Sequence, residues 1–82
     1  MKIFLIEDDK ALANLISATI EKYGFDVTIG KNFQHLDQEF LAIQPHLVLM
    51  DVNLPYFDGF YWTKMIRKHA NVPIIFLSAR DH

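Results

Sequence analysis

Five residues that carry a carboxylate or a hydroxyl follow three short apolar runs of this sequence. They are Glu7, Asp8 and Asp9 after residues 3–6, Asp51 after residues 47–50, and Ser78 after residues 74–77. Unbroken apolar runs of this length are typical of parallel strands that helices cover on both faces. The carboxyl ends of parallel strands lie along one edge, where open α/β sheets bind their ligands. We therefore expect these side chains to converge at one edge of a sheet.

Carboxylates that converge in this way need a proton or a cation between them. Two unit charges about 4 Å apart repel each other by about 4 kcal/mol at an effective dielectric constant of about 20. Mg²⁺ takes oxygen ligands and retains waters, so it suits an open carboxylate cluster. Asp51 then keeps one oxygen free beside the metal, which favours phosphoryl transfer onto that oxygen. Ser78 is placed to donate a hydrogen bond to the transferred group.

Each of these features also has an ordinary structural explanation. An acidic triplet before a helix commonly caps that helix and interacts favourably with its dipole. An aspartate after a strand is a common turn former. We favour a shared site because all three features fall at the same predicted edge.

Strand and helix patterns alternate along the rest of the chain. Helices are predicted over residues 10–23, from a cap at Asn32 to Pro45, and over residues 60–69, and the strands are predicted over residues 3–6, 25–29, 46–50 and 74–77. Asp9 is expected to cap the first helix, and Gly24 to take a left-handed conformation after it. The fold class is α/β, with a doubly wound parallel sheet and right-handed crossovers.

The composition of the chain excludes several classes of protein. The 82 residues suffice for one small domain, and 51% of them are hydrophobic, which indicates a globular chain. A net charge of −2 does not indicate the basic surface that nucleic-acid binding requires. The absence of cysteine excludes disulfides and thiolate zinc sites and fits a reducing cytosol. The longest apolar runs are far too short to span a bilayer, so no membrane insertion is expected.

Three motifs closely resemble those of response-regulator receiver domains of two-component signalling. They are Glu7-Asp8-Asp9, Asp51-Val52-Asn53-Leu54-Pro55 with Asp58-Gly59, and Ser78-Ala79. The resemblance covers residues 1–82 and implies a flavodoxin-like receiver domain. It implies that Asp51 accepts a phosphoryl group from the phosphohistidine of a sensor histidine kinase. It further implies that Asp8 binds Mg²⁺ directly, Glu7 mainly through water and Asn53 through its backbone carbonyl, with Ser78 as the switch hydroxyl.

The Glu-Asp-Asp triplet looks most like the subfamily whose output is a winged-helix DNA-binding domain. Within that subfamily, residues 58–62 resemble regulators from Gram-positive bacteria that respond to envelope stress and antimicrobial peptides. The resemblance implies a cytoplasmic transcriptional regulator that forms a homodimer on activation. It would bind DNA through a domain that is not present in this chain.

Some family features do not occur within residues 1–82. Family members have a fifth strand that ends in a lysine near the phosphoryl group, an aromatic switch residue on that strand, and two further helices. We therefore expect a receiver domain truncated after its fourth strand, with strand order 2-1-3-4 and an exposed apolar edge strand. Without the lysine charge, phosphorylation of the fragment is expected to be weak or absent.

Two other functions compete with that of a receiver. A Mg²⁺-dependent phosphatase that forms an aspartyl phosphate needs a second aspartate two residues after the nucleophile, where this chain has Asn53, which cannot deliver a proton. The resemblance implies no enzyme beyond assistance to its own phosphorylation and dephosphorylation. A pseudo-receiver that is not phosphorylated and works by protein contact alone is the other alternative.

Overall fold

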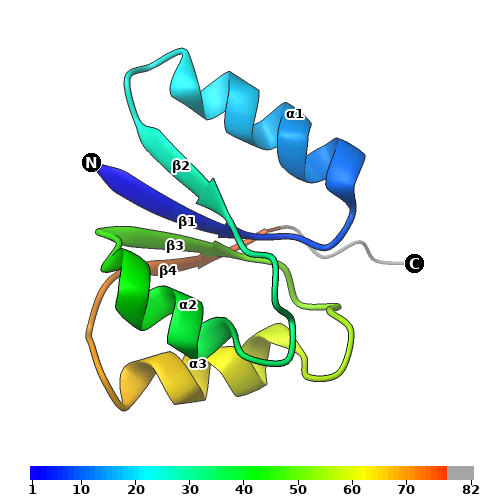
Figure 1. The fold of residues 1–82 in the computed structure, drawn as a ribbon, viewed down its shortest axis with the longest axis vertical. Helices are drawn as coiled ribbons and strands as arrows, with labels where there is room; N and C mark the ends of the chain where they lie inside the picture. Colours follow the sequence, from blue (N-terminus) through cyan, green and yellow to red (C-terminus); the bar gives the residue numbers. More distant parts are fainter. Residues whose placement is uncertain (78–82) are drawn as a thin grey trace.

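Four parallel strands form one sheet in the order β2-β1-β3-β4 in the computed structural model, which describes residues 1–77 (Figure 1). The elements are β1 (Lys2–Ile6), α1 (Lys10–Glu21), β2 (Asp26–Ile29), α2 (Leu36–Ile43), β3 (Leu47–Met50), α3 (Gly59–Arg67) and β4 (Ile74–Phe76). The predicted doubly wound α/β class and the strand order 2-1-3-4 are confirmed. Among the described residues, no helix is long and apolar enough to cross a membrane.

Helices cover both faces of the sheet, with α1 on one side and α2 and α3 on the other (Figure 1). The largest buried cluster lies between the sheet and α2 and α3. It comprises Phe4, Ile6, Val48, Met50, Leu36, Phe40, Trp62 and Ile66, none of which is more than 3% exposed. On the other face, α1 buries Ala13 and Ser17. Because the cluster takes alternate residues from β1 and β3, it holds together the two strands that lead into the acidic residues.

Two helices begin at aspartates that cap them through their side chains. Asp9 Oδ1 accepts a hydrogen bond of 3.1 Å from the backbone N–H of Leu12, as predicted for α1. Asp58 Oδ1 accepts one of 2.9 Å from Tyr61 at the start of α3. Gly24 has the left-handed φ of 89° that was expected after the first helix.

The prediction that Asn32 caps the second helix was wrong. The helix begins at Leu36, and its N-cap, His35, makes no side-chain capping bond. Asn32 Oδ1 instead accepts a hydrogen bond from the N–H of Gln34, because a short amide side chain can close a local turn in place of a helix cap. The Glu39 carboxylate accepts from the N–H groups of Lys31 and Asn32, each at 3.0 Å, and ties α2 to the preceding loop.

Strand β4 is one of the two outer strands of the sheet that residues 1–77 form, next to β3. Ile75 is 52% exposed and Phe76 is 38% exposed. The exposed apolar edge expected from the sequence is therefore present in the described part of the chain, and such an edge favours pairing with another polypeptide.

Replacing Gly59 by alanine should destabilise the fold. A Cβ atom at this position would collide with the backbone oxygen of Asp51 and would lie 3.0 Å from Met50 Cγ. Because the colliding atom belongs to the backbone, the loop after β3 would have to move. We expect the free energy of unfolding to fall by about 1–3 kcal/mol, measured by urea denaturation.

Gly30→Ala provides the matched control. A Cβ atom there would meet only side-chain atoms, with Leu36 Cδ2 at 3.0 Å and the Phe4 ring at 3.3 Å. These side chains can shift, so the loss should be smaller than at Gly59. An equal loss in the two variants would contradict a specific role for the close approach at Gly59.

Candidate metal centre

The carboxyl ends of β1 and β3 lie side by side. The two strands pair in parallel with Ile6 opposite Met50, so Glu7 and Asp51 occupy equivalent positions just beyond them. The backbone N–H of Asp51 donates a 2.9 Å hydrogen bond to the Ile6 oxygen, and that of Leu77 donates a 2.8 Å bond to the Met50 oxygen. The backbone ladder thus extends past the strands and sets the positions from which the acidic side chains project.

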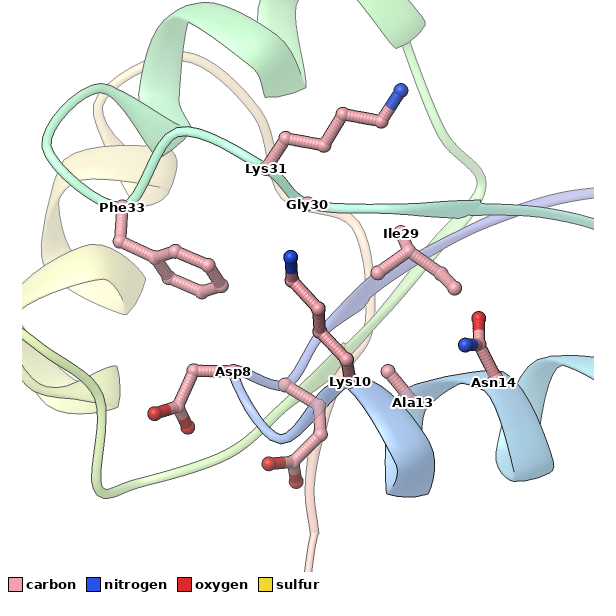
Figure 2. A pocket seen from close by; sticks show the side chains of 9 residues that line it. Asp8, Lys10, Ala13, Asn14, Ile29, Gly30, Lys31 and Phe33 are labelled. Carbon is pink, nitrogen blue, oxygen red and sulfur yellow. The ribbon is translucent and has the colours of Figure 1, made fainter.

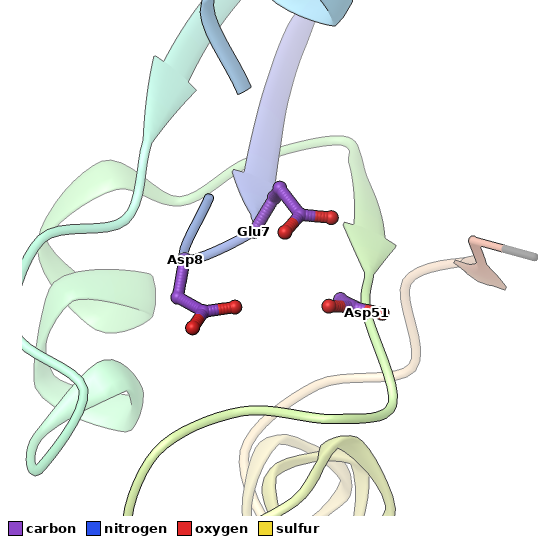
Figure 3. Close-up of side chains that lie close together, drawn as sticks. All are labelled: Glu7, Asp8 and Asp51. Carbon is purple, nitrogen blue, oxygen red and sulfur yellow. The ribbon is translucent and has the colours of Figure 1, made fainter. Parts of the chain in front are cut away.

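Three carboxylates converge at this edge. Glu7, Asp8 and Asp51 each offer an oxygen that lies within 4.8 Å of those of the other two. Figure 3 shows the carboxylates of Asp8 and Asp51 facing each other across a gap, with Glu7 beside them. Glu7 is buried, Asp51 is half-buried and Asp8 is exposed, so the cluster is open to solvent on one side. Oxygen donors at this spacing fit a small divalent cation that keeps part of its water shell.

The three residues of the acidic triplet have different roles: Asp9 is structural, and Glu7 and Asp8 belong to the converging cluster. Asp9 caps α1 and does not belong to the converging set, so the ordinary explanation holds for this residue. Its backbone N–H also donates a 3.0 Å hydrogen bond to Glu7 Oε2, which orients the buried carboxylate. Asp51 Oδ1 accepts a 2.9 Å hydrogen bond from the N–H of Val52. Of the three converging carboxylates, the two that are at least partly buried, Glu7 and Asp51, each accept a hydrogen bond from a backbone N–H.

Burial raises the pKa of the Glu7 carboxyl above its ordinary value. The negative charges of Asp51, Asp8 and Asp9 act in the same direction, while the hydrogen bond from the Asp9 N–H partly opposes them. The ionised cluster is therefore electrostatically unfavourable by itself, and a bound cation would relieve both the repulsion and the loss of hydration.

A hollow of about 510 Å³ opens over the cluster. Its lining includes Asp51, the exposed Asn53, and Leu77 at the end of the described chain. The converging carboxylates of Glu7, Asp8 and Asp51 form one side of this hollow. Ser78, the predicted switch hydroxyl, lies outside the described residues.

A second hollow of about 440 Å³ lies on the other side of Glu7 and Asp8. Lys10 reaches into it beside the ring of Phe33 (Figure 2). Asp51 is not part of its lining, so the second hollow does not reach the carboxylate at the end of β3. No sequence pattern indicates this hollow, because it forms between the start of α1 and the loop before α2, which are distant in the sequence.

A parallel α/β sheet with an acidic cluster at the carboxyl ends of adjacent strands defines a doubly wound domain with its site at the ligand-binding edge. The family profile described as "Response regulator receiver domain" matches residues 3–82. The chain therefore belongs to the response-regulator receiver family, and the family predicted from the acidic motifs is confirmed.

Named relatives agree with this assignment. The chain is 51% identical over 81 residues to the sensory transduction protein BceR of Halalkalibacterium halodurans, covering 99% of this chain and 35% of that protein. It is 42% identical over 82 residues to the response regulator protein GraR of Staphylococcus epidermidis, covering 100% of this chain and 37% of that protein. The chain thus spans little more than a third of the length of these relatives.

Solved structures give the same fold. The N-terminal domain of the nisin resistance regulator NsrR, a lantibiotic response regulator, superposes with a TM-score of 0.88 at 42% identity, covering 99% of this chain and 68% of that one. The activated receiver domain of Klebsiella pneumoniae RstA superposes with a TM-score of 0.92 at 30% identity, covering 100% of this chain and 70% of that one.

The raised pKa of Glu7 predicts a pH-dependent gain in stability for Glu7→Gln. The folded chain holds the Glu7 proton more tightly than the unfolded chain does. Stability therefore falls as the pH rises from the unfolded-state pKa to the folded-state pKa and stays reduced above it. Without divalent cations, Glu7→Gln should raise the midpoint of thermal unfolding at pH 7, and the gain should disappear below about pH 4.

Asp26→Asn is the control for this prediction, because it removes an exposed carboxylate at the start of β2, away from the cluster. Its midpoint should stay close to that of the unmodified chain across the same pH range. A Glu7→Gln variant that is less stable than the unmodified chain at pH 7 would contradict the unfavourable burial of this charge.

Proposed function

We propose that the chain is a phospho-accepting signal receiver, in which Asp51 takes a phosphoryl group from a sensor histidine kinase in the presence of Mg²⁺. The proposal rests chiefly on one observation, the convergence of the Asp51 carboxylate with those of Glu7 and Asp8 within 4.8 Å. An isolated aspartate is a weak acceptor for an anionic phosphoryl group. A cation held by the neighbouring carboxylates would offset that charge.

The environment of Asp51 supports its role as the attacking group. Among the described residues, hydrogen bonds to this side chain engage Oδ1, which the N–H of Val52 fixes in place. The remaining carboxylate oxygen is then available at the solvent-open side of the cluster, where a donor can approach. Fixing one oxygen also limits rotation of the carboxylate and so reduces the entropy that must be lost before attack.

The metal ligands follow from the family and fit the donors present. Asp8 would bind Mg²⁺ directly, Glu7 mainly through water, and Asn53 through its backbone carbonyl. The metal, when bound, supplies positive charge next to the transferring group. The buried, hydrogen-bonded position of Glu7 suits an indirect role, because its orientation is already set by the Asp9 N–H. Ser78 would donate a hydrogen bond to the phosphoryl group as the switch hydroxyl.

An aspartyl phosphate would then switch the regulator that contains this domain. The phosphoryl group adds a dianionic centre at the edge of the sheet and pulls Ser78 toward it. We propose that this change favours homodimerisation and DNA binding by a transcriptional regulator, with DNA bound by a domain outside this chain. A relative from Bacillus subtilis that is 42% identical is named the transcriptional regulatory protein YxdJ. The cytoplasm is the proposed location.

The alternative is a pseudo-receiver that acts by protein contact without phosphorylation. The converging carboxylates argue against this alternative, because their repulsion destabilises the fold and is not compensated in a protein that binds no metal. A Mg²⁺-dependent phosphatase is disfavoured by Asn53, whose exposed amide cannot act as a general acid.

Mg²⁺ should stabilise the fold, and Asp8→Asn should remove most of this effect. At a free concentration of about ten times Kd, a ligand of the folded state adds about 1.4 kcal/mol to the free energy of unfolding. We expect thermal denaturation with and without Mg²⁺ to show this gain for the unmodified chain. Asp37→Asn, which removes a carboxylate on α2, should keep the full response. A response of equal size in Asp8→Asn would exclude this residue as a ligand.

Asp51→Asn should abolish phosphorylation. Incubation of the unmodified chain with acetyl phosphate and Mg²⁺, followed by intact-mass spectrometry, should show at most slow addition of a single phosphoryl group, which hydroxylamine removes. The expected rate is low because the family's lysine is not within residues 1–82. Asp26→Asn should behave like the unmodified chain. Incorporation that persists in Asp51→Asn would place the acceptor elsewhere, and a chain that neither binds Mg²⁺ nor incorporates phosphate would be a pseudo-receiver.

A further inference from the structure

A small, solvent-open hollow with one apolar wall, called the cavity below, lies between the C-terminal ends of α2 and α3, at the end of the sheet opposite to the acidic cluster. The two helices run side by side and both end there (Figure 1). The cavity measures about 240 Å³. Its apolar wall includes Phe40, Pro45 and Val72, and Leu41 stands beside them with 46% of its surface exposed. His69 contributes the polar side of the lining.

The size of this cavity suits a single apolar side chain. Sites for drug-sized molecules occupy about 300–1,000 Å³, so this space is small for a free organic ligand. A leucine or phenylalanine side chain of a bound polypeptide would fill it and would cover Leu41 as well. Burial of one such side chain strengthens binding by about tenfold or more, which is a useful anchor and too little for stable binding alone.

The helix that borders the cavity carries exposed positive charge, and Arg67 Nη1 donates a 3.4 Å hydrogen bond to the oxygen of Ala70 in the cavity lining. The sequence contains no aspartate or glutamate between Gly59 and Leu77, whereas α3 and the residue after it carry Lys64, Arg67 and Lys68. All three are exposed, and their spacing places them on the face of α3 opposite to the buried residues of the helix. Lys68 directly precedes His69, which lines the cavity.

We propose that this cavity and the basic face of α3 form a docking site for an acidic peptide segment of a partner protein. An apolar side chain of the segment occupies the cavity, and flanking carboxylates lie over Lys64 and Lys68. The site is at the far end of the sheet from Asp51, so an occupant leaves the acidic cluster open. The proposal therefore does not depend on phosphorylation of this chain.

A peptide fits this face better than an anionic membrane does. Of the apolar residues of α3, Trp62 and Ile66 are buried in the core and cannot insert into lipid, and the exposed Phe60 and Tyr61 lie in the first turn, at the end of the helix away from the cavity. Attraction of three cations to an anionic leaflet gives only weak binding when no apolar face is inserted beside them.

A titration with a defined probe tests the proposal. The probe is a short, capped peptide of aspartates and glutamates around one central leucine, and its matched control has serine in place of that leucine. Amide chemical shifts of the labelled chain should change saturably at Gln44, Ala70, Val72 and along α3. The serine peptide should bind about tenfold more weakly, because it leaves the cavity unfilled. Equal affinity of the two peptides, or shifts centred on Glu7 and Asp8, would overturn the proposal.

Two double variants, each of which neutralises two surface lysines, test the electrostatic part of the proposal. Lys64→Gln with Lys68→Gln should weaken binding of the leucine peptide about tenfold, as expected for the loss of two exposed ion pairs. Lys22→Gln with Lys31→Gln removes the same charge from other surfaces and should leave the affinity unchanged. Equal weakening in both double variants would show attraction by net charge alone and would overturn the site. Binding of the chain to phosphatidylserine vesicles but not to the peptide would overturn it as well.

Discussion

The parallel pairing of β1 with β3 is the constraint on which the site depends. It brings Glu7 and Asp51 to the same edge although they are far apart in the sequence, and it does so against their mutual repulsion. Repulsion between neighbouring carboxylates amounts to several kcal/mol at moderate dielectric. Burial of Phe4, Ile6 and Met50 opposes it, since each buried side chain of this size contributes about 1.5–3 kcal/mol. The core is thus what keeps an unfavourable cluster of charges in place.

The loop after β3 carries a further constraint. Tyr56 adopts a left-handed φ of 69°, which is uncommon for an aromatic residue and costs of the order of 1 kcal/mol or more. Three residues later, Gly59 approaches the backbone of Asp51 so closely that no side chain fits, and its N–H donates a 2.8 Å hydrogen bond to the Val52 oxygen. The loop therefore closes tightly against the acceptor strand, and Asp58 then starts α3. Local strain at Tyr56 is offset by the contacts that this closure makes.

Sequence patterns predicted the elements well where one signal dominated. Unbroken apolar runs identified β1, β3 and β4, and the rule that parallel strands share a carboxyl edge predicted the convergence of Glu7, Asp8 and Asp51. The start of α2 was missed because Asn32 can close a turn or cap a helix, and the reach of Glu39 back to the loop depends on tertiary geometry. The cavities escaped prediction for a similar reason, since each is lined by elements that are distant in the sequence.

Helix α3 connects the acidic edge of the sheet to the cavity at the opposite end. Its first residue, Gly59, packs against the backbone of Asp51, and the segment that follows its last turn lines the apolar cavity through His69. Nine helical residues extend about 13 Å, and the burial of Trp62 and Ile66 makes the helix rigid relative to the sheet. The charges near α3 are separated: carboxylates lie at its N-terminal end, and cations lie along its outer face. Negative charge that is added at Asp51 therefore lies among other carboxylates, and a cation is needed to neutralise it. The basic face of α3 remains available to an anionic partner.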